Sequence, residues 1–316
     1  MNIRYIDPFS QGWDRMTKAL FKPFDIGKWF AVGFTAFLAG LTDFNNGGGG
    51  GGNNSKSDVD FDEIVSFPHY AWQWLMDNPG WFTLIIIGIA AIIGLIFLFT
   101  WLSSRGKFMF LDNVVHDRKL VKKPWNDFRE LGNSLFWWRI VFNLIVIAVF
   151  IYYFWYSFTN LYEEYQEYGA FESMVSSFIG MGLFALLLIL ITAYISTFLS
   201  DFVVPLMYKY NLKTLEAWNR FLGLFQKYIL YFILYGLFKF FIWILFIILI
   251  VLAGIFTCCI GFIFLLLPYI GSVVTLPVSY TFRAFSVEFL EQFGEAYKIF
   301  PEMPQPDGTS MPETQS

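Results

Sequence analysis

Charged residues are scarce in this chain of 316 residues. Only 15% of them are Asp, Glu, Lys or Arg, whereas 57% are hydrophobic and 22% are aromatic. Soluble domains average about 25% charged residues, which help to cover a surface that faces water. The shortage excludes an ordinary soluble domain.

Cysteine is almost absent. The chain has two cysteines, Cys258 and Cys259, and they are adjacent. Consecutive Cα atoms lie about 3.8 Å apart, which is closer than a relaxed disulfide requires. A zinc site would need further Cys or His ligands that this pair lacks. We therefore expect the pair to pack as small apolar residues, with no disulfide and no metal.

The motifs of common hydrolases and nucleotide-binding proteins are missing. The sequence contains no HExxH, no GxSxG and no glycine loop that continues into Lys and Ser/Thr. The glycine run at 47–52 lacks those neighbours, and segment 45–58 is instead typical of a flexible loop. We expect no cofactor and no enzymatic activity.

One acid–base cluster remains as a weak catalytic candidate. Asp112 and His116 are four residues apart, so a helix places both on one face, and Asp117 follows directly. Such a pair could hold a metal or accept a proton from a lipid headgroup. Solvated salt-bridging is the simpler interpretation of these three residues.

Long uncharged runs dominate the sequence. Residues 81–102 and 174–199 contain no charge, and residues 228–280 contain Lys239 as their only Lys or Arg and no acid. About 20 apolar residues in a helix cross a hydrocarbon core that is ~30 Å thick. Lipid offers no partner to backbone N–H and C=O groups, so such runs are helical. We predict an all-α membrane protein with six spans, near 26–44, 81–102, 136–158, 174–199, 229–253 and 257–280. The first span is the weakest, and a re-entrant segment is its alternative.

Basic residues avoid every other connection between these spans. The connections at 1–28, 103–134 and 200–227 hold five, seven and four Lys or Arg, whereas 43–80 holds one and 159–173 holds none. Cytoplasmic loops retain Lys and Arg because these residues are translocated reluctantly. We therefore expect both termini in the cytoplasm. Residues 1–300 form one membrane domain in this prediction, and 301–316 form a disordered tail.

A Trp-led segment precedes each odd-numbered span. In each segment aromatic and apolar residues share one helical face and charged residues share the other, which is typical of a helix in the headgroup plane. The pattern predicts three tandem hairpins, each preceded by an interfacial amphipathic helix. The expected membrane anchors are Trp13, Trp125, Phe128, Trp218 and Phe221.

Lys239 lies well inside an apolar run. Charges within a membrane are unfavourable and are often functional. Lys239 either snorkels to the interface or pairs with a partner, for which Asn143 and Asp201 are candidates. In the second case Lys239 and Asn143 would line a substrate path.

Four short motifs stand before, after and between the first spans: Lys22-Pro-Phe-Asp25, Arg105-Gly-Lys-Phe-Met-Phe-Leu-Asp112, Pro124-Trp-Asn-Asp-Phe128 and Gly132-Asn-Ser-Leu-Phe136. With these motifs the chain resembles prokaryotic multi-pass proteins that are similar to the non-catalytic membrane domain attached to some glycerophosphodiester phosphodiesterases. The resemblance covers about half of the chain. It implies a helical membrane module and not catalysis, because the metal-binding acids of the phosphodiesterase are missing.

Three functions follow from these observations. The first is an accessory, scaffold or lipid-organising module of a prokaryotic cytoplasmic membrane, with lipids and other membrane proteins as partners and no nucleic acid. The second is a transporter or lipid translocator with a path near Lys239. The third is a lipid-modifying enzyme that uses Asp112, His116 and Asp117.

Overall fold

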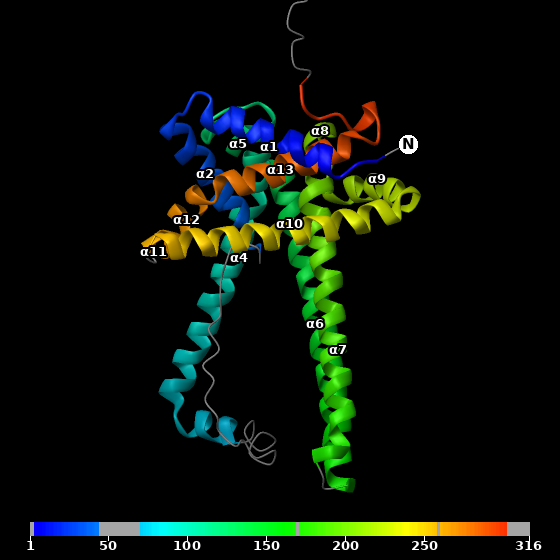
Figure 1. The fold of residues 1–316 in the computed structure, drawn as a ribbon. Helices are drawn as coiled ribbons and strands as arrows, with labels where there is room; N and C mark the ends of the chain where they lie inside the picture. The colour runs from blue at the N-terminus through cyan, green and yellow to red at the C-terminus, as the bar shows by residue number, and fades with distance from the viewer. Residues whose placement is uncertain (1–2, 44–69, 169–170, 258–259, 302–316) are drawn as a thin grey trace, which may run out of the picture.

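The computed structural model describes residues 3–43, 70–168, 171–257 and 260–301. A compact head carries three long helices that project from it in one direction (Figure 1). Helices α1 and α13, near the two ends of the described chain, both lie in the head (Figure 1). The flexible loop expected at 45–58, and the tail expected at 301–316 apart from its first residue, fall outside the described residues.

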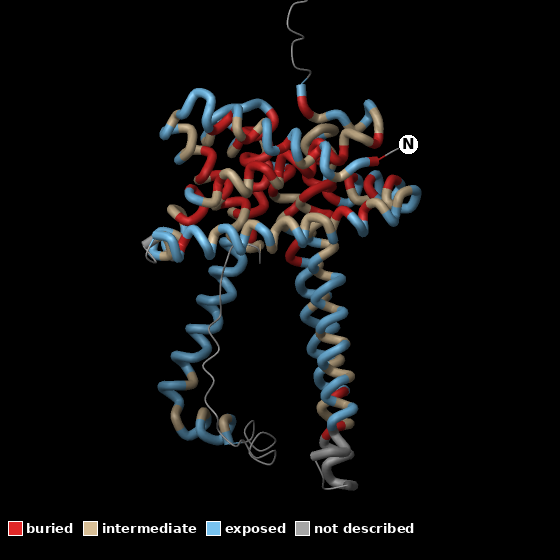
Figure 2. The backbone as a smooth tube through the Cα atoms, in the orientation of Figure 1, coloured by how far each residue is buried: buried red, intermediate tan, exposed pale blue. Residues whose placement is uncertain are grey.

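The projecting helices are α4 (Pro79–Val115), α6 (Arg129–Tyr168) and α7 (Phe171–Phe198). Outside the head, most of their side chains are exposed although they are apolar (Figure 2). Together with α10 (Ile229–Phe256) they supply four helices that are long and apolar enough to cross a membrane. An exposed surface of this kind is stable in lipid and not in water, so the protein is membrane-embedded.

The head contains the hydrophobic core (Figure 2). The two ends of the chain meet there, because α1 (Ile6–Phe21) packs along α13 (Leu276–Glu291). Gly12 permits this contact, since a Cβ atom at this position would lie 2.9 Å from the backbone nitrogen of Phe285. The remaining elements of the head are α5 (Lys122–Asp127), η1 (Leu199–Val203), α8 (Val204–Tyr210), α9 (Thr214–Lys227), α11 (Ile260–Leu266), α12 (Pro268–Val274) and η2 (Glu295–Tyr297).

The first predicted span is a short helix inside the head. Helix α2 (Ile26–Gly40) has 15 residues and packs against α4 and α12. Its length of about 22 Å is less than a ~30 Å hydrocarbon core. Asp43 follows α2 and contacts Lys107. The six-span prediction places Asp43 and Lys107 on opposite sides of the membrane. The six-span arrangement is therefore not confirmed, and this part of it is wrong for the conformation observed.

Helix α10 lies across the underside of the head, at a large angle to the projecting helices (Figure 1). Contacts along its length hold it there: Phe232 stacks on Phe293, and Phe246 packs against Trp13 and Phe282. The sixth predicted span is divided among α11, α12 and α13. Pro268 and Pro277 begin new helices at the breaks, because proline supplies no N–H to the preceding turn.

The Trp-led segments are helical, as the sequence predicts, in α1, α5 with the start of α6, and α9. Their apolar faces rest largely on protein. In α1, Met16 and Leu20 are buried, and in α9, Ala217 and Phe221 are buried. Amphipathic periodicity indicates a face that avoids water but does not specify whether lipid or protein covers it.

Candidate functional site

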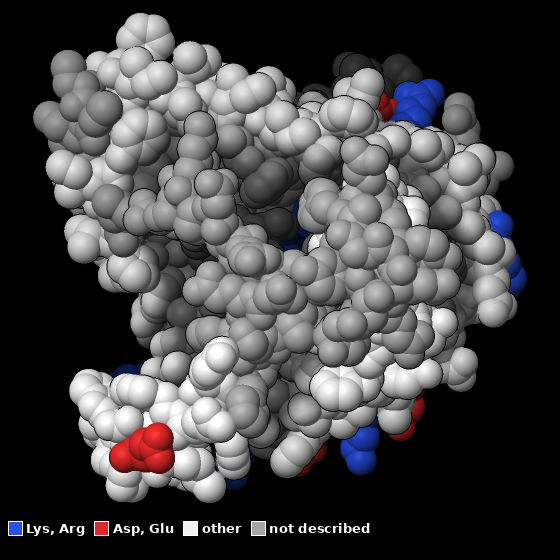
Figure 3. All heavy atoms as spheres, turned by 90° about the horizontal axis from the view of Figure 1, so that it is seen from below, with Lys and Arg blue, Asp and Glu red and all other residues white. Residues whose placement is uncertain are grey.

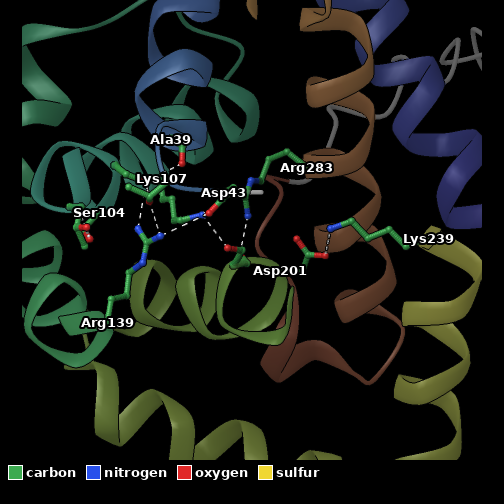
Figure 4. A network of polar contacts seen from close by, with 12 residues as sticks. Ala39, Asp43, Ser104, Lys107, Arg139, Asp201, Lys239 and Arg283 are labelled. Atoms are coloured by element: carbon green, nitrogen blue, oxygen red, sulfur yellow. Dashed lines mark hydrogen bonds and ion pairs between the residues drawn. The ribbon is translucent and has the colours of Figure 1, made fainter. Parts of the chain in front are cut away.

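A widened helical turn lies where α7 enters the head. Residues Leu199–Val203 form the π-helical element η1 between α7 and α8. A π-turn contains an extra residue that disturbs regular helical pairing, and such turns are frequent at functional sites. This one contains Asp201, which lies within a group of charged residues (Figure 4), and Ser200, which bonds to two of them. We call the charged residues together with Ser200 the charged network; it comprises Asp43, Lys107, Arg139, Ser200, Asp201, Lys239 and Arg283.

Lys107 of α4 is fully buried in the network, with 1% of its side chain exposed. Its ammonium lies 2.6 Å from a carboxylate oxygen of Asp43 and donates to the hydroxyl of Ser200 at 2.8 Å. Burial opposes ionisation of Asp43, but Lys107 and Arg139 outweigh it, so the pKa of Asp43 lies below its usual range. Asp43 is therefore a fixed negative charge at neutral pH.

Arg139 of α6 approaches the same carboxylate from the other side. Its guanidinium lies 3.5 Å from Asp43 and donates to the hydroxyls of Ser103 and Thr42. Ser103 in turn donates to the carbonyl of Ala39 at the end of α2. Three helices are thus joined around one carboxylate that serves two cations.

The positive charge of Arg283, in α13, is less well neutralised than the charges of the other cations in the network. Arg283 is 8% exposed and donates from Nη1 to the carbonyl oxygen of Ser200 at 2.6 Å. Its buried Nε atom has no hydrogen-bond partner, and no carboxylate of the described residues forms an ion pair with it. Arg283 lies between the Lys107–Asp43 pair and the Lys239–Asp201 pair (Figure 4).

Lys239 of α10 points into the head and forms an ion pair with Asp201. Tyr235, one turn earlier, donates to the same carboxylate at 2.9 Å. Asp201 was one of the two partners considered from the sequence. The other, Asn143, is exposed on the projecting part of α6 and does not join this cluster. The structure thus brings Lys239 together with Asp201 and not with the residue predicted to share its path.

The network carries an excess of positive charge. Its described residues include four cations and two carboxylates, and Ser200 bonds both Lys107 and Arg283. Viewed from the side of the projecting helices, the surface is hollowed at its centre, and Lys or Arg atoms are visible inside the hollow (Figure 3). Most other charged atoms in this view lie at the margin. The site therefore combines buried positive charge with two partly exposed members, Asp43 and Lys239.

The acid–base candidates form a smaller cluster elsewhere on the head. Asp112 and His116 are 3.3 Å apart, and the hydroxyl of Tyr208 donates to Asp112 and lies 3.2 Å from His116 Nδ1. Asp117 turns away and pairs with Lys28 at 2.6 Å. Within the described part of the chain, no three His, Cys, Asp or Glu residues gather into a group that could hold a metal ion.

The predicted membrane anchors occupy mixed positions. Trp13 is 44% exposed and stacks on Phe246, so it remains compatible with a membrane contact. Phe221 is fully buried in the head, so its ring contacts protein in this conformation. The other three are partly buried and pack on protein rings: Trp125 against Trp101, Phe128 against Phe108 and Trp218 against Trp138.

Sequence reasoning missed Lys107, Arg139 and Arg283 as site residues. Lys107 follows an apolar run, where a cation usually marks cytoplasmic topology. Arg283 had a clearer signal, because it is the first charge after an uncharged stretch that continues beyond the predicted sixth span. The partner of Lys107 was hidden because the six-span scheme placed Asp43 on the opposite face.

One of the motifs behind the resemblance, Arg105–Asp112, contributes Lys107 to this site. Gly106 and Lys107 contact α2 and Asp43, while Gly132 packs on the side chain of Arg105. The comparisons with known proteins name no activity for this arrangement, and the likeness to a phosphodiesterase membrane domain stays a prediction. No curated protein and no solved structure matches the chain. The model of a family of unknown function, DUF7544, matches residues 4–290, and the chain therefore belongs to that family.

Proposed function

We propose that this protein is a non-enzymatic membrane module that organises lipid in the leaflet next to its head. The position of α10 carries the proposal. This helix is as apolar as a membrane span, yet one side packs on the head and the other exposes large hydrophobic residues. A helix held in this way meets acyl chains along its side and lies in the plane of the membrane.

The proposal includes an orientation. The described basic connections lie on the head, while the far ends of the projecting helices α6 and α7, at Tyr168 and Phe171, fall in an acidic part of the sequence. Lys and Arg remain preferentially in the cytoplasm. We therefore place the head and both termini on the cytoplasmic side of a prokaryotic cytoplasmic membrane, with α4, α6 and α7 crossing it. Because these are three crossings and both ends of the chain lie on one side, the proposal requires the chain between Asp43 and Pro79 to cross the membrane as well. A six-span state would require α2, α10 and the α11–α13 segment to leave the head.

Depth measurements along α10 test the proposal. Leu230, Phe241 and Leu252 are exposed on this helix and can each be replaced by a spin-labelled cysteine in a Cys258→Ala, Cys259→Ala background. Equal depths of the three labels in nanodiscs are expected for a helix in the membrane plane. A spanning helix would instead separate the first and last labels by about 33 Å, and that gradient would overturn the proposal. A label at Ile89, on the projecting part of α4, is the matched control for a deep position.

A transporter or lipid translocator is the second candidate. The largely buried Lys239–Asp201 pair at the π-helical turn η1 is the feature that favours it, because transport sites place charges near broken helices. In that case Lys239→Met abolishes movement of solute or labelled lipid across liposomes. A pure protein that moves a defined solute would rule out the lipid-organising function, whereas an unchanged rate in the variant would exclude Lys239 from the path.

A further inference from the structure

We propose that the charged network binds a phosphate group, and that in the membrane this group belongs to the headgroup of an anionic lipid. The inference rests on the proposed function and specifies which lipid the head holds. Four observations carry it: the charge balance of the network, the free donors of Arg283, the level of the site along the spanning helices, and its opening.

The charge balance requires an anion. Lys107, Arg139, Arg283 and Lys239 are opposed by two carboxylates among the described residues. Buried charges that lack a counter-ion are strongly unfavourable, because protein dipoles replace water incompletely. A bound monoanion would neutralise half of this excess, and a dianion would neutralise all of it.

The donors of Arg283 are arranged to receive such a group. Its Nη1 atom is occupied by the carbonyl of Ser200, but Nε has no partner although the residue is more than nine-tenths buried. A guanidinium offers five N–H donors in a planar fork that matches phosphate oxygens. A buried, unpaired N–H is uncommon in folded proteins, which indicates that a missing acceptor completes the site.

Along the spanning helices, the network lies at the depth where the headgroups of one leaflet would be. The apolar run of α4 ends at Leu102, one to two turns before Lys107, and the apolar run of α7 ends at Leu199, directly before Ser200. Arg139 lies near the start of the apolar run of α6. The three spanning helices thus pass from lipid-facing to head-facing sequence at the same place, where phosphate groups of one leaflet would lie.

The network is also open to this level. Asp43 is 36% exposed and Lys239 is 17% exposed at the side chain, so the site is not sealed within the core. The hollow in Figure 3 faces the side from which the spanning helices project, and Lys or Arg atoms are visible within it. An acyl chain could extend from a phosphate in the hollow along the exposed apolar side of α10.

Thermal unfolding in detergent tests the site with three additives. Phosphatidylglycerol, phosphatidylcholine and inorganic phosphate are each added to the purified full chain. We expect phosphatidylglycerol to raise Tm more than phosphatidylcholine does. A matching increase with inorganic phosphate alone would support the site with a free anion as its occupant. Equal shifts from the two lipids, with none from phosphate, would overturn the inference.

Two variants and a control locate the effect. Arg283→Gln removes the unpaired guanidinium without breaking an ion pair, and should weaken the anion-specific response about tenfold, the loss typical of a charge-assisted hydrogen bond. Ser200→Asp places a carboxylate between Lys107 and Arg283, so it should raise Tm without lipid and remove the response to anionic lipid. Arg118→Gln removes the same charge from an exposed position and should leave the response intact.

The outcomes separate this inference from the proposed function. A full anion response in both network variants, or an equal loss in Arg118→Gln, would overturn the phosphate site. Ser200→Asp keeps the test decisive if Arg283→Gln fails to fold. Label depths along α10, measured in the Ser200→Asp protein, report the proposed function independently. Equal label depths together with no preference for anionic lipid would overturn the phosphate site and leave the proposed function standing.

Discussion

Gly106 of α4 lies against the backbone of Ala39 at the end of α2. A Cβ atom at position 106 would lie 2.5 Å from the Ala39 nitrogen and 2.6 Å from the carbonyl carbon of Leu38. Both neighbours are backbone atoms and cannot rotate away. The contact holds α2 within the head and brings Asp43 beside Lys107.

Replacing Gly106 should therefore separate α2 from α4. Gly106→Ala is expected to destabilise the protein by about 1–3 kcal/mol, the usual effect of overpacking, although alanine itself favours a helix. Thermal unfolding in detergent measures the change. Gly94→Ala, on the same helix with no atom within 4 Å of the added Cβ, is the control and should be neutral or stabilising. Equal Tm values for the two variants would show that the close contact has no energetic role.

Lys239 and Asp201 should depend on each other. Each of Lys239→Met and Asp201→Asn leaves one member of a largely buried pair uncompensated, which costs about 3 kcal/mol. The double variant should lose less than the sum, with an interaction energy of about 1–3 kcal/mol. Thermal unfolding of the four proteins in the cycle measures this coupling. Lys227 is an exposed lysine and provides the control: the changes in stability caused by Lys227→Met and Asp201→Asn should be additive. Strict additivity in the Lys239 cycle would contradict the pairing.

Glu288 should make stability pH-dependent. Burial raises the pKa of its carboxyl above 4.5, although its ion pair with Arg15 acts in the opposite direction. A raised native pKa means that the stabilising contribution is complete below the ordinary pKa and is lost as the pH rises through the native value. The Tm of the natural protein minus that of Glu288→Gln should therefore decrease from pH 4.5 upward.

Arg15→Gln provides the matching comparison for Glu288. Without the guanidinium the carboxyl pKa rises further, so the loss of stability should extend to higher pH. The Arg15 guanidinium also lies over the ring of Phe300, with 3.7 Å between Cζ and the ring centre. Losing this contact lowers the Tm of Arg15→Gln at every pH. A Tm difference that grows with pH in the natural protein would contradict the sign argued for Glu288.

The orientation can be tested with two single cysteines in a background without Cys258 and Cys259. Leu120 is exposed on the head, and Asp77 is exposed before the far end of α4. A membrane-impermeant maleimide applied to spheroplasts should label Asp77→Cys, whereas Leu120→Cys should react after the membrane is opened. Labelling of both sites in intact spheroplasts would place head and far end in the same compartment and remove the proposed orientation.

Hydropathy was sufficient to locate α4, α6, α7 and α10, because long uncharged runs have no other stable structure in lipid. It could not place α10, since a helix with apolar residues on every side gives the same signal whether it crosses the membrane or lies under a head. The aromatic contacts of Phe232 and Tyr235 that hold it are non-local. Similarly, α2 is apolar enough for a span but too short, and Gly106 determines its real partner.

The candidate site was only partly accessible from the sequence. Lys239 was evident because charges are rare in such a run, and Asp201 was one of two partners considered for it. The pair formed by Asp43 and Lys107 could not be inferred, because the alternation of basic and acidic connections separated the two residues. Charge counting describes whole loops, whereas Asp43 is a single acid at the very start of its loop.

The wide turn at Leu199–Val203 also has a consequence for how the sequence can change. An inserted residue rotates everything after it by about 100° relative to what comes before. The lipid-facing stripe of α7 and the buried faces of α8 are consequently out of phase, although the backbone remains continuous. Deleting one residue here would restore a regular helix. It would also turn either the carboxylate of Asp201 or the carbonyl of Ser200 away from its cation. The number of residues in this short stretch should therefore vary less than the identity of its apolar residues.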